Sequence, residues 1–141
     1  MMTHSALADR IRDIVDDFSL FDNWMEKYEY LIELGRSLPI IDEAYKTDAY
    51  KIHGCQSQVW LRAERNNGHV VFTADSDALI TKGLIALLVR VFSDQPASEI
   101  ARADLSFLDE IGMKEHLSPT RKNGLNEMVN QMKRYALAFT Q

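Results

Sequence analysis

The chain has 141 residues, of which 46% are hydrophobic and 26% are charged, and these proportions are typical of one soluble globular domain. Its net charge of −5, without a long basic run, argues against binding to nucleic acid or to an anionic membrane surface. The longest apolar run, residues 84–89, is too short to span a bilayer, the N-terminus lacks the apolar core of a secretory signal, and one cysteine without an export signal indicates the cytoplasm.

Two amphipathic helices are predicted in the first 40 residues. Ser5 is expected to cap the first helix, and Asp22 is expected to cap a second helix that stops at Gly35 and Pro39. Apolar residues recur in both at the three- and four-residue spacing of one helix face: Leu7, Ile11, Ile14 and Phe18 in the first, then Trp24, Tyr28, Leu31 and Ile32 in the second. Residues 39–54 follow no period and predict a loop.

A β-hairpin is predicted next. Residues 57–65 alternate, with Val59, Leu61 and Ala63 on one face, which indicates a strand with one face on a core. The sequence Asn66-Asn67-Gly68 predicts a tight turn, because Asn and Gly tolerate positive φ. Residues 69–74 then form the returning strand.

The second half of the chain is predicted to be mostly helical. The segment Asp75-Ser76-Asp77 is expected to cap a helix that runs to about Phe92 and is apolar around most of its circumference, which predicts a buried central helix. Gln95-Pro96 is expected to break the chain.

Shorter helices are predicted at 97–103 and 107–111, and Ser118 and Pro119 predict the start of a last helix that runs to the C-terminus. This order of elements predicts an α+β fold with helices packed on a small antiparallel sheet.

The only cysteine, Cys55, lies where the long loop enters the first strand. A single thiol cannot close a disulfide within its own chain or supply the four ligands of a closed zinc site. Most lone cysteines are packing residues, but Gly54 before Cys55 and three polar residues after it are poor surroundings for a core thiol. His53 lies two residues away, so either a Cys/His pair or a solvated loop histidine fits the sequence.

The run of residues 54–60, Gly-Cys-Gln-Ser-Gln-Val-Trp, resembles the SufE family, the sulfur-acceptor proteins of iron–sulfur cluster assembly that include the CsdE branch. The resemblance covers roughly residues 20–135. Its other matching positions are Asp75-Ser76-Asp77-Ala78, Lys82-Gly83-Leu84, residues 116–121, Gly124-Leu125, and Trp24, Tyr28, Leu31, Leu34-Gly35 and Leu38-Pro39 in the early helix. His53 is not a fixed position in this family, which counts against a catalytic Cys/His pair.

The resemblance implies one SufE-like domain over residues 1–141, with an α+β fold related to the IscU-type scaffold and a three-stranded antiparallel sheet. Residues 50–52 are the candidate for the third strand. It further implies that Cys55 takes persulfide sulfur from a cysteine desulfurase, SufS- or CsdA-like, and passes it to an iron–sulfur scaffold, SufBCD-like, or to another acceptor. The chain would then stimulate that enzyme rather than act as a stand-alone enzyme.

No cofactor and no metal are expected on this chain itself, because the pyridoxal phosphate belongs to the partner desulfurase. A monomer and a homodimer both remain open. Two other functions also remain open: a regulatory module that binds a desulfurase without covalent chemistry, and a small Cys/His hydrolase, which would require His53 or His116 near Cys55.

The neighbours of Cys55 each allow more than one interpretation. Arg121 can steady an anionic sulfur, pair with an acid of the loop, or be a solvated residue of the last helix. Asp75 and Asp77 can hold the cysteine loop through backbone hydrogen bonds, or cap the following helix. Trp60 can shield the sulfur, contact the partner, or simply pack.

The polar residues Gln56, Ser57 and Gln58 can bond the loop, face the partner, or lie solvated at a strand edge. We further expect the resting thiol to lie in an apolar pocket and to swing out to receive sulfur, a movement that Gly54 and the long preceding loop would permit.

Overall fold

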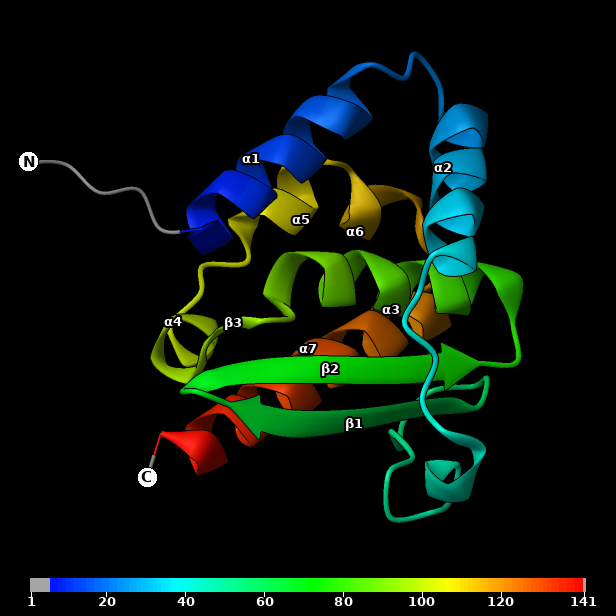
Figure 1. Cartoon of the computed structure of the whole chain (residues 1–141). Helices are drawn as coiled ribbons and strands as arrows, with labels where there is room; N and C mark the ends of the chain where they lie inside the picture. Colours follow the sequence, from blue (N-terminus) through cyan, green and yellow to red (C-terminus); the bar gives the residue numbers. More distant parts are fainter. Residues whose placement is uncertain (1–5, 141) are drawn as a thin grey trace, which may run out of the picture.

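The computed structural model describes residues 6–140, in which helices pack on one face of a three-stranded antiparallel sheet (Figure 1). The elements in chain order are α1 (Ala6–Ser19), α2 (Trp24–Arg36), the 3₁₀ helix η1 (Glu43–Tyr45), β1 (Val59–Asn66), β2 (His69–Ser76), α3 (Leu79–Phe92), β3 (Gln95–Pro96), α4 (Ala97–Ala101), α5 (Ser106–Glu110), α6 (Met113–His116) and α7 (Pro119–Phe139). The predicted α+β class is confirmed.

The two N-terminal helices form where periodicity predicts them, but their ends differ. Ser5, the expected cap of α1, lies outside the described residues. Helix α2 is capped by Asn23 rather than Asp22: the Asn23 side chain accepts a hydrogen bond from the Glu26 amide, and the Glu26 carboxylate accepts one from the Asp22 amide. This arrangement is a variant of the capping box, in which the Glu26 carboxylate bonds to the residue before the N-cap instead of to the N-cap itself. The helix also continues through Gly35, which is buried against α3.

The hairpin has the predicted turn. Asn66 pairs with His69, and the two residues between them, Asn67 and Gly68, both have positive φ, as a two-residue hairpin turn requires. Alternate residues of β2 are buried, beginning with Val70, so one face of the sheet lies on the core.

The third strand is not where it was expected. β3, at Gln95–Pro96, pairs with the start of β2 instead of merely breaking the chain. Residues 50–52 lie at the opposite edge of the sheet, beside β1, where Lys51 forms an isolated antiparallel bridge with Trp60. Two backbone hydrogen bonds flank this bridge, from Ile52 N to Val59 O and from Leu61 N to Tyr50 O. They fix both ends of the segment 53–58, which carries Cys55 and is called the cysteine loop below.

Helix α3 is the central buried helix, as its apolar circumference predicts, and ten of its 14 residues are buried. It lies between the sheet and α2, while α7 runs behind the hairpin (Figure 1). Its predicted capping is wrong: the N-cap residue is Ala78, which makes no side-chain hydrogen bond to the helix. Asp75 and Ser76 instead belong to β2.

The remaining helices agree with the sequence patterns. α4 and α5 fall in the two predicted stretches, and a third short helix, α6, follows them. Ser118 caps α7 by accepting a hydrogen bond from the Arg121 amide, with Pro119 in the first helical position. Within residues 6–140, the structure contains no helix of the length and hydropathy needed to cross a membrane.

Replacement of Gly83 should destabilise the contact between α2 and α3. A Cβ atom at this position would lie 2.4 Å from the carbonyl oxygen of Leu31, and backbone cannot yield as a flexible side chain does. Gly83→Ala is therefore expected to lower the free energy of unfolding by about 1–3 kcal/mol in urea denaturation. Gly35→Ala is the matched control across the same contact, because its Cβ would meet nothing closer than 3.4 Å. Equal stability of the two variants would contradict this packing.

Candidate functional site

Cys55 lies near the tip of a short loop, residues 53–58, that joins the paired segment 50–52 to β1. The hydrogen bond from Ile52 N to Val59 O, 2.8 Å long, closes the loop at its base. Gly54 has a φ of +92°, a conformation that residues with a Cβ rarely adopt. The glycine before Cys55 is therefore needed to turn the chain so that the thiol points back toward the protein.

The thiol lies over a small cavity between the start of α3 and the start of α7. The cavity has a volume of about 90 Å³ and is lined by Cys55, Gln56, Ser57, Ala78, Thr81, Leu84, Thr120, Arg121, Gly124 and Met128. Cys55 Sγ lies 3.7 Å from the carbonyl oxygen of Gly124 and donates a weak hydrogen bond to it. Cys55 is partly buried. The expectation of a pocket is met in part, because its lining mixes apolar and polar residues.

The surroundings of Cys55 disfavour its ionised form. Burial raises the pKa of the thiol, and the nearby carboxylate of Glu127 raises it further. Loss of hydration and a negative neighbour both penalise a thiolate. At rest the site therefore holds a protonated thiol rather than an activated nucleophile of the kind found in cysteine hydrolases.

Asp77 anchors the end of the loop. Its carboxylate accepts a hydrogen bond of 3.0 Å from the Gln58 amide, and its own amide donates one of 3.3 Å to the Gln58 carbonyl. Of the two interpretations open for Asp77, holding the loop is therefore the one that the geometry matches, and capping α3 is not.

Asp75 joins the long loop to β2 and α3 through two cations. Its carboxylate lies 2.7 Å from Lys46 Nζ and 3.3 Å from Lys82 Nζ, with 14% of its side chain exposed. Burial alone would raise the pKa of Asp75, but hydrogen bonds from Lys46 and the Ser76 amide and the charge of Lys82 outweigh it, so the pKa is lowered. Lys46 also lies over the ring of Trp60, 5.6 Å from its centroid.

The other predicted site residues divide into two groups. Gln56, Ser57 and Arg121 line the cavity beside Cys55, although Gln56 and Arg121 are exposed toward solvent. Trp60 and His53 do not line it: Trp60 lies beside Lys46, and His53 is exposed.

No histidine within residues 6–140 hydrogen-bonds to the thiol. His116 instead stacks on Trp24, with ring centroids 4.3 Å apart. This geometry gives no support to a Cys/His hydrolase, which needs a base within hydrogen-bonding reach of its nucleophile.

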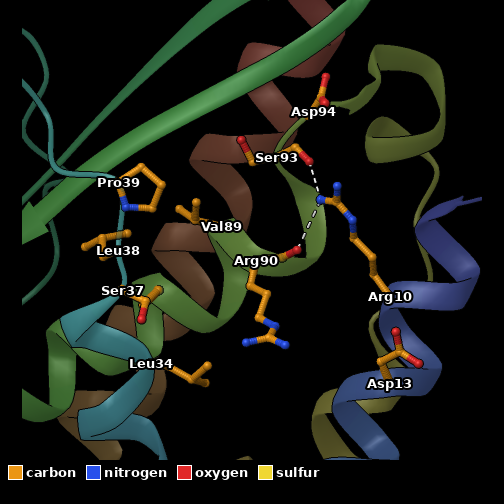
Figure 2. Close-up of a pocket in the computed structure, with 11 residues that line it drawn as sticks. Arg10, Asp13, Leu34, Ser37, Leu38, Pro39, Val89, Arg90, Ser93 and Asp94 are labelled. Carbon is orange, nitrogen blue, oxygen red and sulfur yellow. Dashed lines mark hydrogen bonds between the residues drawn. The ribbon is translucent and has the colours of Figure 1, made fainter.

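A larger cleft, of about 560 Å³, lies elsewhere, between α1, the end of α2 and the C-terminal end of α3. Figure 2 shows Arg10 reaching from α1 to the backbone carbonyls of Arg90 and Ser93. Arg10 and Arg90 face this cleft together with Asp13 and Asp94, so its charges balance. Its lining contains no cysteine or histidine, so its larger volume does not make it the better candidate for a site of thiol chemistry.

Several residues of the site were missed by sequence reasoning, among them Glu127 and Lys46. Glu127 packs against Gly54, and Lys46 holds Asp75. Glu127 follows Gly124 by three residues and so shares its helix face, but only the fold places Gly124 beside Cys55. Lys46 lies in the segment without periodicity and gave no signal of its own.

Comparison with known proteins identifies the domain. The sequence model of the family described as "SufE: Fe-S metabolism associated domain" matches residues 12–136. An uncharacterised SufE-like protein of Rhizobium meliloti is 42% identical over 125 residues, covering 85% of this chain and 89% of that protein. A second, from Rhizobium etli, is 42% identical and covers 87% and 86%.

Two further comparisons agree with this. The chloroplastic/mitochondrial SufE-like protein 1 of Arabidopsis thaliana is 42% identical over 135 residues, which are 93% of this chain but 36% of that longer protein. Among solved structures, the solution structure of a hypothetical protein from Thermus thermophilus matches with a TM-score of 0.78, covering 93% of this chain and 96% of that one at 16% identity. At that identity the match supports the fold alone.

Removing the Asp77 carboxylate should loosen the cysteine loop. Asp77→Ala leaves the Gln58 amide without its acceptor, and one lost hydrogen bond of about 1 kcal/mol corresponds to an increase of about fivefold in the population of the open loop. The alkylation rate of Cys55 by a neutral reagent should rise by a similar factor. Asp48→Ala, at an exposed position of the same long loop, is the control. If both variants react like the wild-type protein, Asp77 does not hold the loop.

The raised thiol pKa also predicts a pH-dependent contribution to stability. A group whose pKa is higher in the folded than in the unfolded protein stabilises the fold fully below its unfolded pKa, and this contribution is lost as the pH rises through the folded value. The difference in unfolding free energy between wild-type protein and Cys55→Ser should thus shrink as the pH rises above the ordinary thiol value of 9.0. Urea denaturation at a series of pH values measures this, and a difference that grows with pH would have the wrong sign.

Proposed function

This chain belongs to the SufE family, a family associated with Fe–S metabolism, and on that premise we propose that it is a sulfur carrier that accepts persulfide sulfur on Cys55. The donor is a pyridoxal-phosphate-dependent cysteine desulfurase, and the acceptor is an iron–sulfur scaffold complex or another sulfur acceptor. Transfer to Cys55 relieves the desulfurase of its product and so stimulates it. The proposal places the protein in the cytoplasm.

The observation that carries the proposal is the placement of Cys55. The thiol lies on a loop with a fixed base and a weakly held tip, over a cavity of about 90 Å³. A carrier must present one sulfur atom to two partners in turn, and loops on a rigid scaffold are suited to that task. The absence of a hydrogen-bonded base among residues 6–140 fits a carrier better than a hydrolase.

The transfer step needs no oxidant. The Cys55 thiolate attacks the outer sulfur of the persulfide on the desulfurase, a new S–S bond forms at Cys55, and the S–S bond of the donor breaks. The donor cysteine leaves as a thiolate, so one thiolate is consumed and one is formed, as in thiol–disulfide exchange.

Docking, rather than thiol activation, must supply most of the rate. A thiol with an ordinary pKa is only a few per cent ionised at pH 7. Lowering its pKa by about one unit would gain only about two- or threefold, because nucleophilicity falls as acidity rises. Positioning of two reactants can contribute effective molarities of about 10⁵ M or more. The raised pKa of Cys55 in the free protein is therefore compatible with fast transfer in the complex.

A mass measurement tests the proposal. Incubation with cysteine and a desulfurase should add one sulfur atom, roughly 32 Da, to the wild-type chain and nothing to Cys55→Ser. Because the chain has one cysteine, the added sulfur has one possible site. Stimulation of cysteine turnover should likewise disappear in Cys55→Ser, whose unfolding midpoint serves as the control for folding.

Two outcomes would contradict the proposal. If Cys55→Ser keeps most of the stimulation, the protein regulates the desulfurase by binding alone. If the wild-type chain gains no sulfur while the desulfurase turns over cysteine, Cys55 is not an acceptor.

A further inference from the structure

Glu127 lies against the cysteine loop in an unusual setting. Its side chain packs beside Gly54, where a Cβ atom would lie 3.0 Å from Glu127 Cγ and 3.9 Å from Oε2. The side chain is partly buried. Among the side chains that the structure describes, none forms an ion pair or hydrogen bond with its carboxylate. Partial burial of an unpaired carboxylate costs free energy, so its position beside the thiol calls for an explanation.

The resting position of Cys55 accepts a neutral thiol and not an anion. The S–H group donates to the carbonyl oxygen of Gly124, and a thiolate has no proton to donate. An ionised sulfur in the same place would face that carbonyl oxygen and the Glu127 carboxylate together. Both are negative, so two repulsions would replace one hydrogen bond.

The other charged groups around the cavity do not reverse this preference. From α3, the lining residues Ala78, Thr81 and Leu84 carry no charge. On α7, Arg121 lies at the exposed rim, and on the loop itself His53 is exposed. Burial raises the thiol pKa most, and the carboxylate of Glu127 raises it further.

We propose that Glu127 is a positioning residue that couples ionisation of Cys55 to departure of the loop from the cavity. The protonated thiol stays docked on Gly124, and the thiolate is expelled by the adjacent carboxylate. The functional consequence of this inference rests on the proposed function. The thiolate that would attack a donor persulfide then exists mainly outside the cavity, where the donor can reach it. Inside the cavity the thiol is kept unreactive.

The coupling makes a specific prediction for Glu127→Gln, which keeps the shape of the side chain and removes its charge. The charge of Glu127 acts on a docked thiolate and not on a docked neutral thiol. At low pH the docked form is the neutral thiol, so the substitution leaves its equilibrium with the exposed thiolate unchanged. At high pH the thiolate of the variant can remain docked. Alkylation rates of the two proteins should therefore coincide at low pH and diverge at high pH, where the plateau of the variant is about two- to fivefold lower.

The experiment uses the full-length protein without any donor. The Cys55 thiolate is titrated by its ultraviolet absorbance, with the curve of Cys55→Ser subtracted to remove tyrosine ionisation, and alkylation by iodoacetamide is measured from about pH 6 to 10. Glu127→Gln should show a lower titration midpoint and a lower alkylation plateau than the wild-type protein. Glu29→Gln, an equal change of charge at an exposed position of α2, should match the wild-type protein in both.

Each other result would overturn the coupling. An unchanged midpoint would mean that Glu127 does not act on the thiolate. A lower midpoint with an unchanged plateau and faster reaction at low pH would mean that the thiolate forms and reacts while docked. A similar effect in Glu29→Gln would mean that the change comes from the net charge of the protein and not from the position of Glu127. Failure of sulfur transfer would contradict the proposed function. The titration uses no donor and therefore tests the coupling separately.

Discussion

The base of the cysteine loop is held by backbone pairing, and the position of Cys55 depends on it. Ile52 bonds to Val59 on one side, and Gln58 exchanges two hydrogen bonds with Asp77 on the other. Such bonds contribute about 1 kcal/mol each. The tip is held only by a thiol–carbonyl contact of 3.7 Å, which is weaker. Departure of the tip from the cavity, as proposed, would break only that contact and would leave β1 and β2 paired.

Two acidic residues near the loop differ in how their charges are compensated. Asp75 is paired with two lysines and accepts a hydrogen bond from the Ser76 amide, so its charge stabilises the junction of loop, sheet and α3. Glu127 has no such partner among the described side chains, lies beside Gly54, and acts on the ionisable thiol of Cys55. The first arrangement favours a single conformation. The second favours the docked loop only while the thiol keeps its proton.

Local patterns predicted much of this fold because the forces that they report are local. The Asn67-Gly68 turn and the Ser118-Pro119 helix start depend on conformational preferences of a few residues, and both are confirmed. The capping role expected for Asp75–Asp77 is wrong, because acids that cap a helix and acids at the end of a strand look alike in sequence. Their actual partners, Lys46 and Gln58, lie 29 and 19 residues earlier in the chain.

The rest of the site needed the tertiary fold. Gly124 lies 69 residues from Cys55, and no spacing rule connects them. The strand β3 has two residues, too few for alternation to be seen. The run of residues 54–60 identified Cys55 as the candidate site residue. The groups that raise its pKa or hydrogen-bond to it come from α7, and the sequence of α7 shows only an amphipathic helix.

The volumes of the two cavities described above bear on what each could hold. Sites for small-molecule ligands are usually clefts of about 300–1,000 Å³, and the cleft beside Arg10 falls in that range while offering no nucleophile. The hollow at Cys55, about 90 Å³, is too small for such a ligand. One further sulfur atom, bonded about 2 Å beyond Sγ, is within its capacity. A cavity of this size does not admit larger molecules, so under the proposed function a partner protein would reach the sulfur by movement of the loop rather than by entry of a substrate into the cavity.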